Sequence, residues 1–328
     1  MMEKTTLDTL NATYLHLQRL STEDGPGIRT TVFLKGCSLH CAWCHNPESI
    51  SSKPFLQWHS RLCIGCQTCI LSCPNDSLSM QDGVLRIDRN VCRLCGVCTD
   101  ACPANALEIL GKKIYSSELI DELLKDSAFF ARSGGGVTFS GGEPALQPEF
   151  TATVMETLRE RGIHTALDTC GNIPRASLEL ILPYTDLVLY DIKLMDSRQH
   201  KQFTRAGNEL ILENLRWLVH YIRHDAPSVQ LWIRTPLIPQ ATATQANLQA
   251  IAAFLTEFED VIERWELCAF NNLCHDKYAR LGMHWEYADR PLMTQAELNE
   301  CQTWARTIYR KPQIVNVTGA ARSEQSKG

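Results

Sequence analysis

The chain has 328 residues, with 32 Lys and Arg against 37 Asp and Glu, and a formal net charge of −5. The charge is small, and no basic stripe is present in the sequence, which argues against nucleic-acid binding. No apolar stretch is long enough to span a membrane. Residues 1–21 lack the continuous apolar segment of a signal peptide, so we expect a cytoplasmic protein. The fifteen cysteines are therefore expected to be reduced or metal-bound rather than paired in disulfides.

The first cysteine motif has the spacing C-x3-C-x2-C and comprises Cys37, Cys41 and Cys44. Three thiolates hold only three irons of a [4Fe-4S] cube, which leaves the fourth iron open to bind another molecule. A cluster with an open iron is a reaction centre rather than an electron carrier alone. We therefore predict that these three cysteines are catalytic as well as metal-binding, and that they support radical chemistry on a bound small molecule.

Two further motifs have the form C-x2-C-x2-C-x3-C-P, which is typical of bacterial two-cluster ferredoxins. In such ferredoxins the fourth cysteine of each run ligates the other cluster. One predicted cube is held by Cys63, Cys66, Cys69 and Cys102, and the other by Cys92, Cys95, Cys98 and Cys73. Zinc sites and disulfide scaffolds are the alternatives, but two identical four-cysteine runs are typical of neither. The sequence thus predicts three [4Fe-4S] clusters.

The length of the chain predicts roughly two domains. The two ferredoxin-type runs are an internal repeat, and residues 54–112 are predicted to form an inserted, ferredoxin-like domain. This insert interrupts a larger domain that consists of residues 1–53 and 113–328. Because so short a segment buries little apolar surface, we expect its clusters to hold it folded.

Outside the insert, predicted strands alternate with predicted helices. Strands are expected at 30–35, 136–140, 164–169, 187–192, 229–236 and 265–270. Helices are expected at 116–131, 148–161, 175–182, 208–224, 244–258 and 294–309. The last begins after Thr294, a predicted N-cap with Glu297 three residues on. This alternation predicts an α/β fold with a parallel sheet. Six units are too few for a closed eight-fold barrel, so we expect a partial (β/α)6 barrel with its site at the carboxyl ends of the strands.

Polar motifs directly follow four of the predicted strands. They are Ser-Gly-Gly-Glu-Pro at 140–144, Asp-Thr-Cys-Gly at 168–171, Asp-Ile-Lys at 191–193 and Arg-Thr-Pro at 234–236. Gly141 and Gly142 allow close approach of the backbone to a ligand, and Glu143 can bind an ammonium group. Each motif is weak alone, but four of them at successive strand ends predict one site.

These residues resemble a known family. The first cysteine motif, with Trp43 before its last cysteine, is similar to that of the radical S-adenosylmethionine (SAM) superfamily. Segments 21–29, 32–37 and 46–48, together with 141–144, 168–171 and 191–193, resemble the activating enzymes of glycyl radical enzymes. The resemblance runs from about residue 14 to residue 280. The insert resembles that of the subgroup serving decarboxylases, lyases and dehydratases.

The resemblance implies a mechanism and partners. SAM would chelate the open iron through its amino and carboxylate groups, and an electron from the cube would cleave its sulfonium. The resulting 5′-deoxyadenosyl radical would take a hydrogen from the Cα of a glycine in a partner glycyl radical enzyme, which is the protein substrate. A flavodoxin or ferredoxin would serve as electron donor.

The resemblance also implies roles at the SAM site. Glu143, with the backbone of Gly141 and Gly142, would bind the methionine ammonium. The Asp-Ile-Lys motif, formed by Asp191, Ile192 and Lys193, would also contact SAM. Its Lys193 would bind the methionine carboxylate.

Other implied contacts lie around the same molecule. A monovalent cation beside SAM would be bound by Asp168, Thr169 and Asp191, as in some family members. Asn214 either reaches the ribose or backbone of SAM or packs its helix, and Trp43 either lies near adenine or shields the cluster. The family often has a histidine after the sixth strand. This chain has Asn271 there, which either replaces the histidine contact or leaves it unmade.

Two alternatives remain open at the level of sequence. One is a radical SAM enzyme that acts on a small-molecule substrate, and the other is an electron-transfer iron-sulfur protein without chemistry of its own. The open-iron motif argues against the carrier, and the segment at 24–29 favours a protein substrate. For the four cysteines outside the motifs, a buried structural role is expected, with a radical relay as the alternative: Cys170, Cys268, Cys274 and Cys301.

Overall fold

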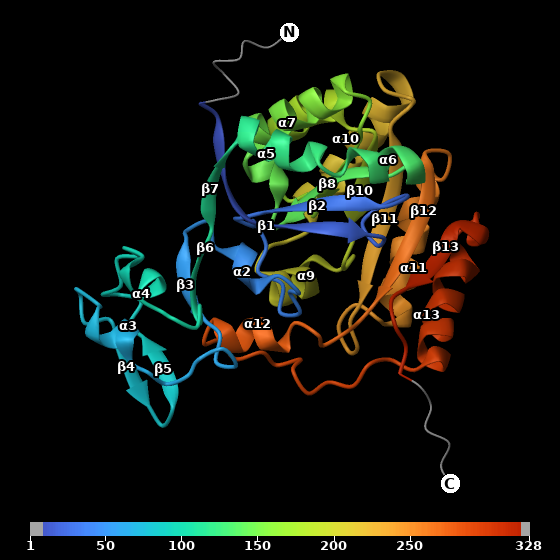
Figure 1. Ribbon diagram of the computed structural model, residues 1–328. Coiled ribbons are helices and arrows are strands. Elements are labelled where there is room, and N and C mark those ends of the chain that lie inside the picture. Colours follow the sequence, from blue (N-terminus) through green and yellow to red (C-terminus); the bar gives the residue numbers. More distant parts are fainter. Residues whose placement is uncertain (1–8, 323–328) are drawn as a thin grey trace.

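The computed structural model describes residues 9–322, which form one nine-stranded sheet with helices packed around it and a smaller segment with sheets of its own (Figure 1). The strand order in the large sheet is β13-β12-β11-β10-β9-β8-β2-β1-β7. Its strands are β1 Asn11–Ser21, β2 Arg29–Leu34, β7 Lys112–Tyr115, β8 Gly136–Gly141, β9 His164–Thr169, β10 Leu187–Asp191, β11 Gln230–Leu237, β12 Ile262–Ala269 and β13 Val315–Thr318. All neighbours from β2 to β13 are parallel, whereas β1 is antiparallel to both β2 and β7.

The six predicted strands are confirmed as β2 and β8 to β12, and they are neighbours in chain order. All six residues of β2 are buried, as expected for a parallel strand that is covered on both faces. Among the described strands, β7 and β13 each have a single neighbour. The sheet is therefore open, as a partial barrel requires, and the α/β class with a mainly parallel sheet is confirmed.

Three strands of this sheet were not predicted. The pairing of β1 with β2 is irregular between Tyr14 and His16 and again between Gln18 and Ser21. Each irregularity changes the face on which side chains lie, so the period-two pattern that would mark a strand is lost. The other two strands, β7 and β13, have four residues each, which is too short for a clear pattern.

The predicted helices are present, with one division. The segment predicted as a single helix at 116–131 forms α5 Ser116–Leu124 and α6 Ser127–Ser133. The chain turns between them because the carboxylate of Asp126 accepts a hydrogen bond from Thr30 Oγ1 at 2.7 Å and pairs with Arg19. The other predicted helices are α7 Pro148–Glu160, α8 Arg175–Ile181, α10 Glu209–His224, α11 Gln245–Leu255 and α13 Gln295–Ile308.

Short helices that the sequence pattern did not reveal are α2 Pro47–Ile50, α9 Ser197–Thr204 and α12 His275–Arg280. Single 3-10 turns are η1 Pro144–Leu146, η2 Leu182–Tyr184, η3 Thr256–Phe258 and η4 Pro312–Ile314. None of the helices within residues 9–322 is both long and apolar enough to cross a membrane.

The cysteine-rich segment lies beside the β7 edge of the large sheet (Figure 1). Its strand β3 Phe55–Trp58 pairs antiparallel with β6 Leu107–Leu110, and β4 Leu78–Gln81 pairs with β5 Val84–Ile87. Helices α3 Thr68–Leu71 and α4 Val97–Asp100 occupy equivalent places in the two repeats. Its apolar cluster has only five buried residues, which are Leu56, Leu78, Leu85, Cys98 and Leu107. So small a core agrees with the expectation that metal clusters stabilise this segment.

The predicted N-cap of the last helix is a complete capping box. Thr294 Oγ1 accepts from the backbone N–H of Glu297 at 3.2 Å, and the Glu297 carboxylate accepts from the backbone N–H of Thr294 at 2.7 Å. We predict that Thr294→Ala destabilises the first turn of α13 by about 1 kcal/mol, and that its amides exchange hydrogen roughly fivefold faster. Thr303→Ala, at an exposed position within the same helix, is the matched control. Equal exchange in the two variants would contradict the cap.

Candidate active site

A cavity of about 270 Å³ opens at the carboxyl ends of the parallel strands, where loops that follow successive strands meet. The loop after β2 contributes all three cysteines of the first motif, namely Cys37, Cys41 and Cys44. Other predicted residues in its wall are Trp43, Gly141, Gly142, Asp168, Thr169, Asp191 and Lys193. The structure therefore brings together most of the site that was predicted from the four strand-end motifs.

The three motif cysteines lie in surroundings that suit metal ligands. Burial raises the pKa of Cys41 to about 11 and that of Cys44 to about 12, so neither thiol would ionise at neutral pH without a cation. A bound metal ion supplies that cation and deprotonates the thiol. Within residues 9–322, no three Cys, His, Asp or Glu side chains converge on a point as they would around a single ion. All three cysteines nevertheless line the same cavity, as the ligands of one cluster would.

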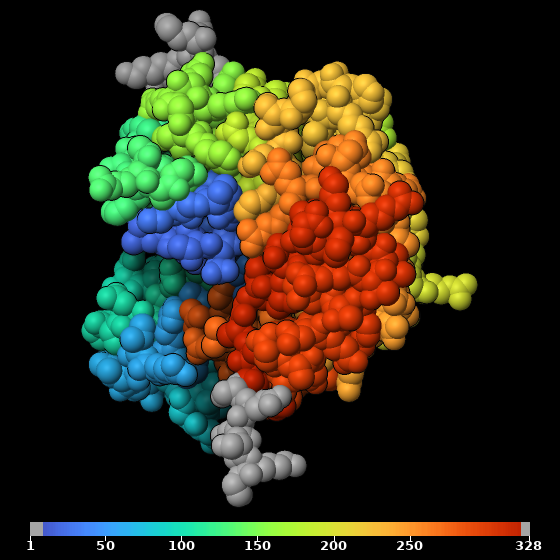
Figure 2. Space-filling model, turned by 90° about the vertical axis from the view of Figure 1, so that its right-hand side faces the viewer, coloured from blue at the N-terminus to red at the C-terminus, as the bar shows by residue number. Residues whose placement is uncertain are grey.

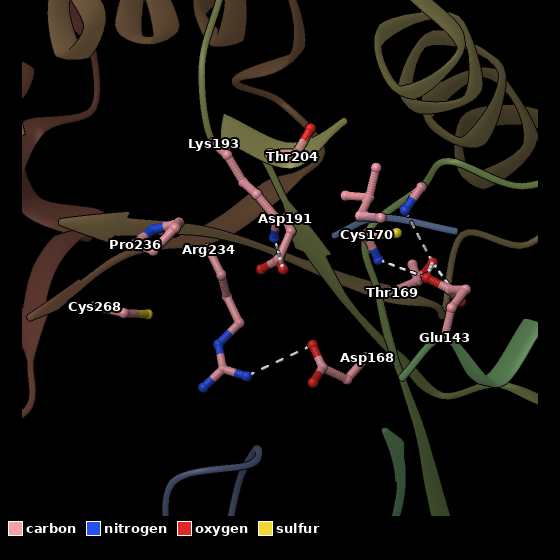
Figure 3. Close-up of polar contacts among 12 residues, drawn as sticks. Glu143, Asp168, Thr169, Cys170, Asp191, Lys193, Thr204, Arg234, Pro236 and Cys268 are labelled. Carbon is pink, nitrogen blue, oxygen red and sulfur yellow. Dashed lines mark hydrogen bonds and ion pairs between the residues drawn. The ribbon is translucent and has the colours of Figure 1, made fainter. Parts of the chain in front are cut away.

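Lys193 brings a buried positive charge to the cavity. Its Nζ pairs with the carboxylate of Asp191 (Figure 3). Asn247 Nδ2 donates to the Lys193 carbonyl at 3.0 Å. Burial alone would lower the pKa of Lys193. The carboxylate of Asp191 is the main opposing influence, and the pKa of Lys193 is raised above its ordinary value. Lys193 therefore stays protonated, and it can bind an anionic group of a ligand.

Asp168 and Arg234 form a second charged pair in the same cavity wall, where Arg234 is also the register neighbour of Asp191 (Figure 3). Arg234 Nη1 lies 3.6 Å from Asp168 Oδ1, and Ser140 Oγ donates to Asp168 at 2.6 Å. Burial raises the pKa of Asp168 to about 6, although Arg234 opposes this shift. Arg234 Nε also lies 3.2 Å from Glu266, and its Nη2 donates to the carbonyl of Glu23 at 3.0 Å. Arg234 thus ties β11 to β9, β12 and the loop before β2.

In this structure the Glu143 side chain lies behind the cavity wall, and its predicted contact with a ligand stays a prediction. Glu143 is completely buried and does not line the cavity. Its carboxylate accepts hydrogen bonds from Thr169 Oγ1 at 2.9 and 3.0 Å, from Cys170 N at 2.8 Å and from Ala145 N at 3.1 Å (Figure 3). Burial raises its pKa well above the usual range. Glu143 therefore braces the loops behind the cavity wall.

Three other predicted contacts also lie outside the cavity wall. Ile192 is buried, and its backbone N–H donates to the Arg234 carbonyl at 2.9 Å. Asn214 Nδ2 donates to the carbonyls of Gly171 at 2.9 Å and Ile173 at 2.8 Å, so it fixes the loop after β9 from helix α10. The Asn271 carbonyl is 2.9 Å from His45 Nε2. Of the two alternatives for Asn214, the structure thus favours packing of its own helix.

The predicted cation ligands do not converge. The carboxylate of Asp168 turns to Ser140 and Arg234, that of Asp191 turns to Lys193, and the hydroxyl of Thr169 turns to Glu143. A cation would have to displace these partners, so the arrangement does not fit one.

Nine residues of the cavity wall were not predicted as site residues: Leu39, His45, Asn46, Ser49, Ser140, Cys170, Arg234, Pro236 and Cys268. Arg234 was present in a strand-end motif, and its position towards the carboxyl end of β11 was the available signal. The pKa of Cys170 is raised well above its usual range by a hydrogen bond with the Cys37 thiol and by burial. Cys170 and Cys268 therefore lie at the cavity, whereas Cys274 and Cys301 are buried elsewhere, as expected.

The cysteines of the insert group in two further, smaller cavities. One is lined by Cys63, Cys66, Cys69 and Cys102, and the other by Cys73, Cys92, Cys95 and Cys98. These are the two sets that the ferredoxin pattern predicts, each with its fourth cysteine from the other run. Around each set the backbone is left-handed at equivalent positions, Gly65 and Gln67 in one repeat and Leu94 and Gly96 in the other. All fifteen cysteines are free, so both sets are available to bind clusters.

Comparison with known proteins decides the family. A family model described as "4Fe-4S single cluster domain" matches residues 23–209. The isethionate sulfite-lyase activating enzyme of Nitratidesulfovibrio vulgaris is 38% identical over 96% of this chain and 97% of its own length. The (2S)-3-sulfopropanediol dehydratase activating enzyme of Klebsiella oxytoca is also 38% identical, over 82% of this chain and 84% of its own. The chain belongs to the radical SAM activating enzymes of glycyl radical enzymes.

This membership confirms the predicted enzyme class, and a [4Fe-4S] cluster and SAM are the cofactors of such an enzyme. Among solved structures, SuiB of Streptococcus suis bound to its precursor peptide SuiA is similar in fold. The two chains are 13% identical, the match covers 87% of this chain and 47% of the SuiB chain, and the TM-score is 0.50.

The contacts of Glu143 lead to a prediction for this activating enzyme. Glu143→Ala leaves the Thr169 hydroxyl and two backbone N–H groups buried without an acceptor, each at a cost of about 1–3 kcal/mol. We expect amides at 143–147 and 168–173 to exchange hydrogen at least about tenfold faster. Glu149→Ala, at an exposed position of α7, is the control. Weaker SAM binding with unchanged exchange would instead make Glu143 a direct ligand.

Proposed function

We propose that this enzyme binds SAM in the 270 Å³ cavity, beside a [4Fe-4S] cluster held by Cys37, Cys41 and Cys44. The observation that carries the proposal is the composition of one cavity wall. Three cysteines with the spacing for an open-iron cube share it with a protonated lysine and two strand-end glycines. The amino acid part of SAM carries one positive and one negative charge, and this wall offers groups for both.

The residues of the wall divide the recognition of SAM between them. The charge of Lys193 suits the methionine carboxylate, because a charge-assisted contact in a buried site is stronger than one in water. The backbone of Gly141 and Gly142 suits the methionine ammonium. A Cβ on Gly142 would lie 2.1 Å from the Gly36 carbonyl oxygen, so only glycine lets this loop approach the cysteine loop. Trp43 offers an aromatic face at the same cavity.

A cluster held by Cys37, Cys41 and Cys44 would supply the electron for reductive cleavage of SAM to methionine and a 5′-deoxyadenosyl radical, and this radical would take a hydrogen atom from the partner's glycine. The chain's own residues hold SAM in place and exclude water. The partner is a glycyl radical enzyme of the lyase, decarboxylase or dehydratase type. Similarity to the isethionate sulfite-lyase and sulfopropanediol dehydratase activating enzymes supports a protein substrate rather than a small molecule.

We further propose that the insert at 54–112 is a domain that carries two [4Fe-4S] clusters and relays electrons to the reactive site. The grouping of its eight cysteines in two cavities supports this. A flavodoxin or ferredoxin is the proposed donor, because such proteins work at the low potentials that these clusters reach. We place the enzyme in the cytoplasm, where its thiols stay reduced.

The cluster count gives a first test of this proposal. We predict about twelve irons per chain after anaerobic reconstitution, because three cubes hold four irons each. A variant with Cys37, Cys41 and Cys44 changed to Ala should retain about eight irons and lose all reductive cleavage of SAM. Iron and sulfide assays, with chromatography of 5′-deoxyadenosine, measure both. A native protein that binds only about four irons would remove the relay, and a variant that still forms 5′-deoxyadenosine would remove the assignment of the reactive site.

The second test concerns the partner. With SAM and a reductant, the enzyme should produce a stable radical on a glycine of a glycyl radical enzyme encoded near its own gene. Deuterium placed on that glycine should appear in 5′-deoxyadenosine, and the doublet splitting of the EPR signal should collapse. A partner whose glycine is changed to Ala is the control. Consumption of a small molecule, with no protein radical on any candidate partner, would support the small-substrate alternative instead.

A further inference from the structure

Helix α12 lies between the insert and the loop that carries Cys37, Cys41 and Cys44, although it belongs to neither. In Figure 2, orange atoms of the region that includes α12 meet the blue and teal atoms that include the insert. Residues on one side of the helix, three and four positions apart, contact the cysteine loop: Cys274, Lys277 and Tyr278. Residues with the same spacing on its other side line a cavity against the insert: Asp276, Ala279 and Arg280.

Contacts from α12 and the segment after it hold the cysteine loop in place. Tyr278 Oη donates to the Cys44 carbonyl at 2.9 Å. Lys277 Nζ donates to Asn46 Oδ1 at 2.7 Å and pairs with Glu48 at 2.7 Å. Trp285, which stacks on Tyr278 with ring centroids 5.0 Å apart, donates from Nε1 to the Ala42 carbonyl at 3.0 Å. Three side chains thus fix the backbone on both sides of Cys44.

The other side of α12 faces one of the two cysteine sets. A cavity of about 640 Å³ is lined by α12 together with Trp58, Cys63 and Gly65 of the insert. Trp58 and Cys63 also line the cavity of the set that contains Cys63 and Cys102. Among the described residues, no part of α12 lines the cavity of the Cys92 set. The helix therefore adjoins the first set on one side and the Cys44 loop on the other.

The position of the insert against this helix is fixed by hydrogen bonds and cation–π contacts. Arg89 of the insert donates to the Leu281 carbonyl at the end of α12 and to the Leu56 carbonyl, both at 3.0 Å. The ring of Phe55 lies 4.4 Å from Lys35 Nζ and 5.4 Å from the Arg89 guanidinium carbon. Lys35 is fully buried and donates to the Glu48 carbonyl at 2.6 Å. These contacts fix the distance between the insert and the reactive loop, which electron transfer requires.

We propose that α12 is the bridge between the insert and the reactive site, and that the set Cys63, Cys66, Cys69 and Cys102 is the electron donor next to it. The inference rests on the proposed relay, and it adds the order of the relay and the role of Tyr278. The step moves one electron and no proton. A cluster on the Cys63 set would be oxidised by one electron as a cluster on the Cys37 set is reduced by one. The low-potential protein donor would then reduce the cluster on the Cys63 set again.

Paired variants test the order directly. Cys66→Ala with Cys69→Ala removes the Cys63 set, and Cys95→Ala with Cys98→Ala removes the other set at equivalent positions of the repeat. Each reconstituted protein is reduced with dithionite, and pulsed EPR measures the magnetic coupling between the remaining insert cluster and the reactive cluster. We expect stronger coupling, and hence a shorter distance, in the Cys95/Cys98 variant. Stronger coupling in the Cys66/Cys69 variant would overturn the order.

The iron content separates failure of this inference from failure of the proposed function. If the unmodified protein holds no iron in the insert, the proposed relay and this inference both fall, whereas the proposed reaction at the SAM site stands. If each variant retains one insert cluster and the coupling order is reversed, only the inference falls.

Tyr278→Phe tests the bridge while it keeps the ring that packs on Trp285. We expect loop amides near Cys44 to exchange hydrogen roughly fivefold faster, because one buried hydrogen bond is lost. We also expect weaker magnetic coupling between the insert and the reactive cluster. Tyr287→Phe, in the same aromatic cluster, is the matched control. Faster exchange with unchanged coupling would reduce Tyr278 to a purely structural residue and overturn its positioning role.

Discussion

The site depends on one buried side chain, the carboxyl group of Glu143, and on the backbone next to it. The Glu143 N–H donates to the Gly36 carbonyl at 2.7 Å, which attaches the end of β8 to the cysteine loop. Its side chain accepts from the loop after β9 through Thr169 and Cys170. A buried carboxyl group that loses its hydrogen-bond donors is costly in free energy. The loops that supply these donors therefore move together with Glu143. The cysteines and the SAM-facing backbone are thereby held at a fixed separation.

This constraint explains why the two glycines precede Glu143. A Cβ on Gly141 would lie 2.4 Å from the Leu34 carbonyl oxygen, and one on Gly142 would lie 2.1 Å from that of Gly36. Gly141 also has a φ of +108°, which L side chains rarely adopt. The two glycines are therefore required by the close backbone packing at the end of β8. The same packing places their backbone at the cavity wall.

The charges around the cavity form one connected series on neighbouring strands. Lys193 pairs with Asp191 at the end of β10, Asp191 is the register neighbour of Arg234 on β11, and Arg234 pairs with Asp168 on β9. The carboxylate of Asp191 raises the pKa of Lys193 despite burial, so Lys193 stays protonated. Charges paired in this way avoid the large desolvation cost of a lone buried charge. The pairing also explains why the carboxylates do not gather around a cation.

Sequence alone was sufficient for the parts that follow from chain periodicity and ligand spacing. The six strands, the helices between them and the grouping of the insert cysteines rest on local patterns, and each appears in the structure. The direction of the Glu143 carboxylate was not predictable, because it depends on donors at Thr169 and Cys170, which another loop supplies. Strand β1 was missed because its irregular pairing hides the alternation.

Helix α12 shows most clearly where sequence reasoning ends. Its six residues are too few for a clear helical period, and its two sides face partners more than 190 residues away, at Cys44 and at Cys63. The sequence around Cys44 and Cys63 does not indicate that a helix packs there, and the sequence of α12 does not indicate these two partners. Yet the insert has a core of only five buried residues and needs an external surface to hold its position. A helix that contacts both the insert and the reactive loop meets that need, so stable docking of the insert and alignment of its clusters with the reactive site depend on the same contacts.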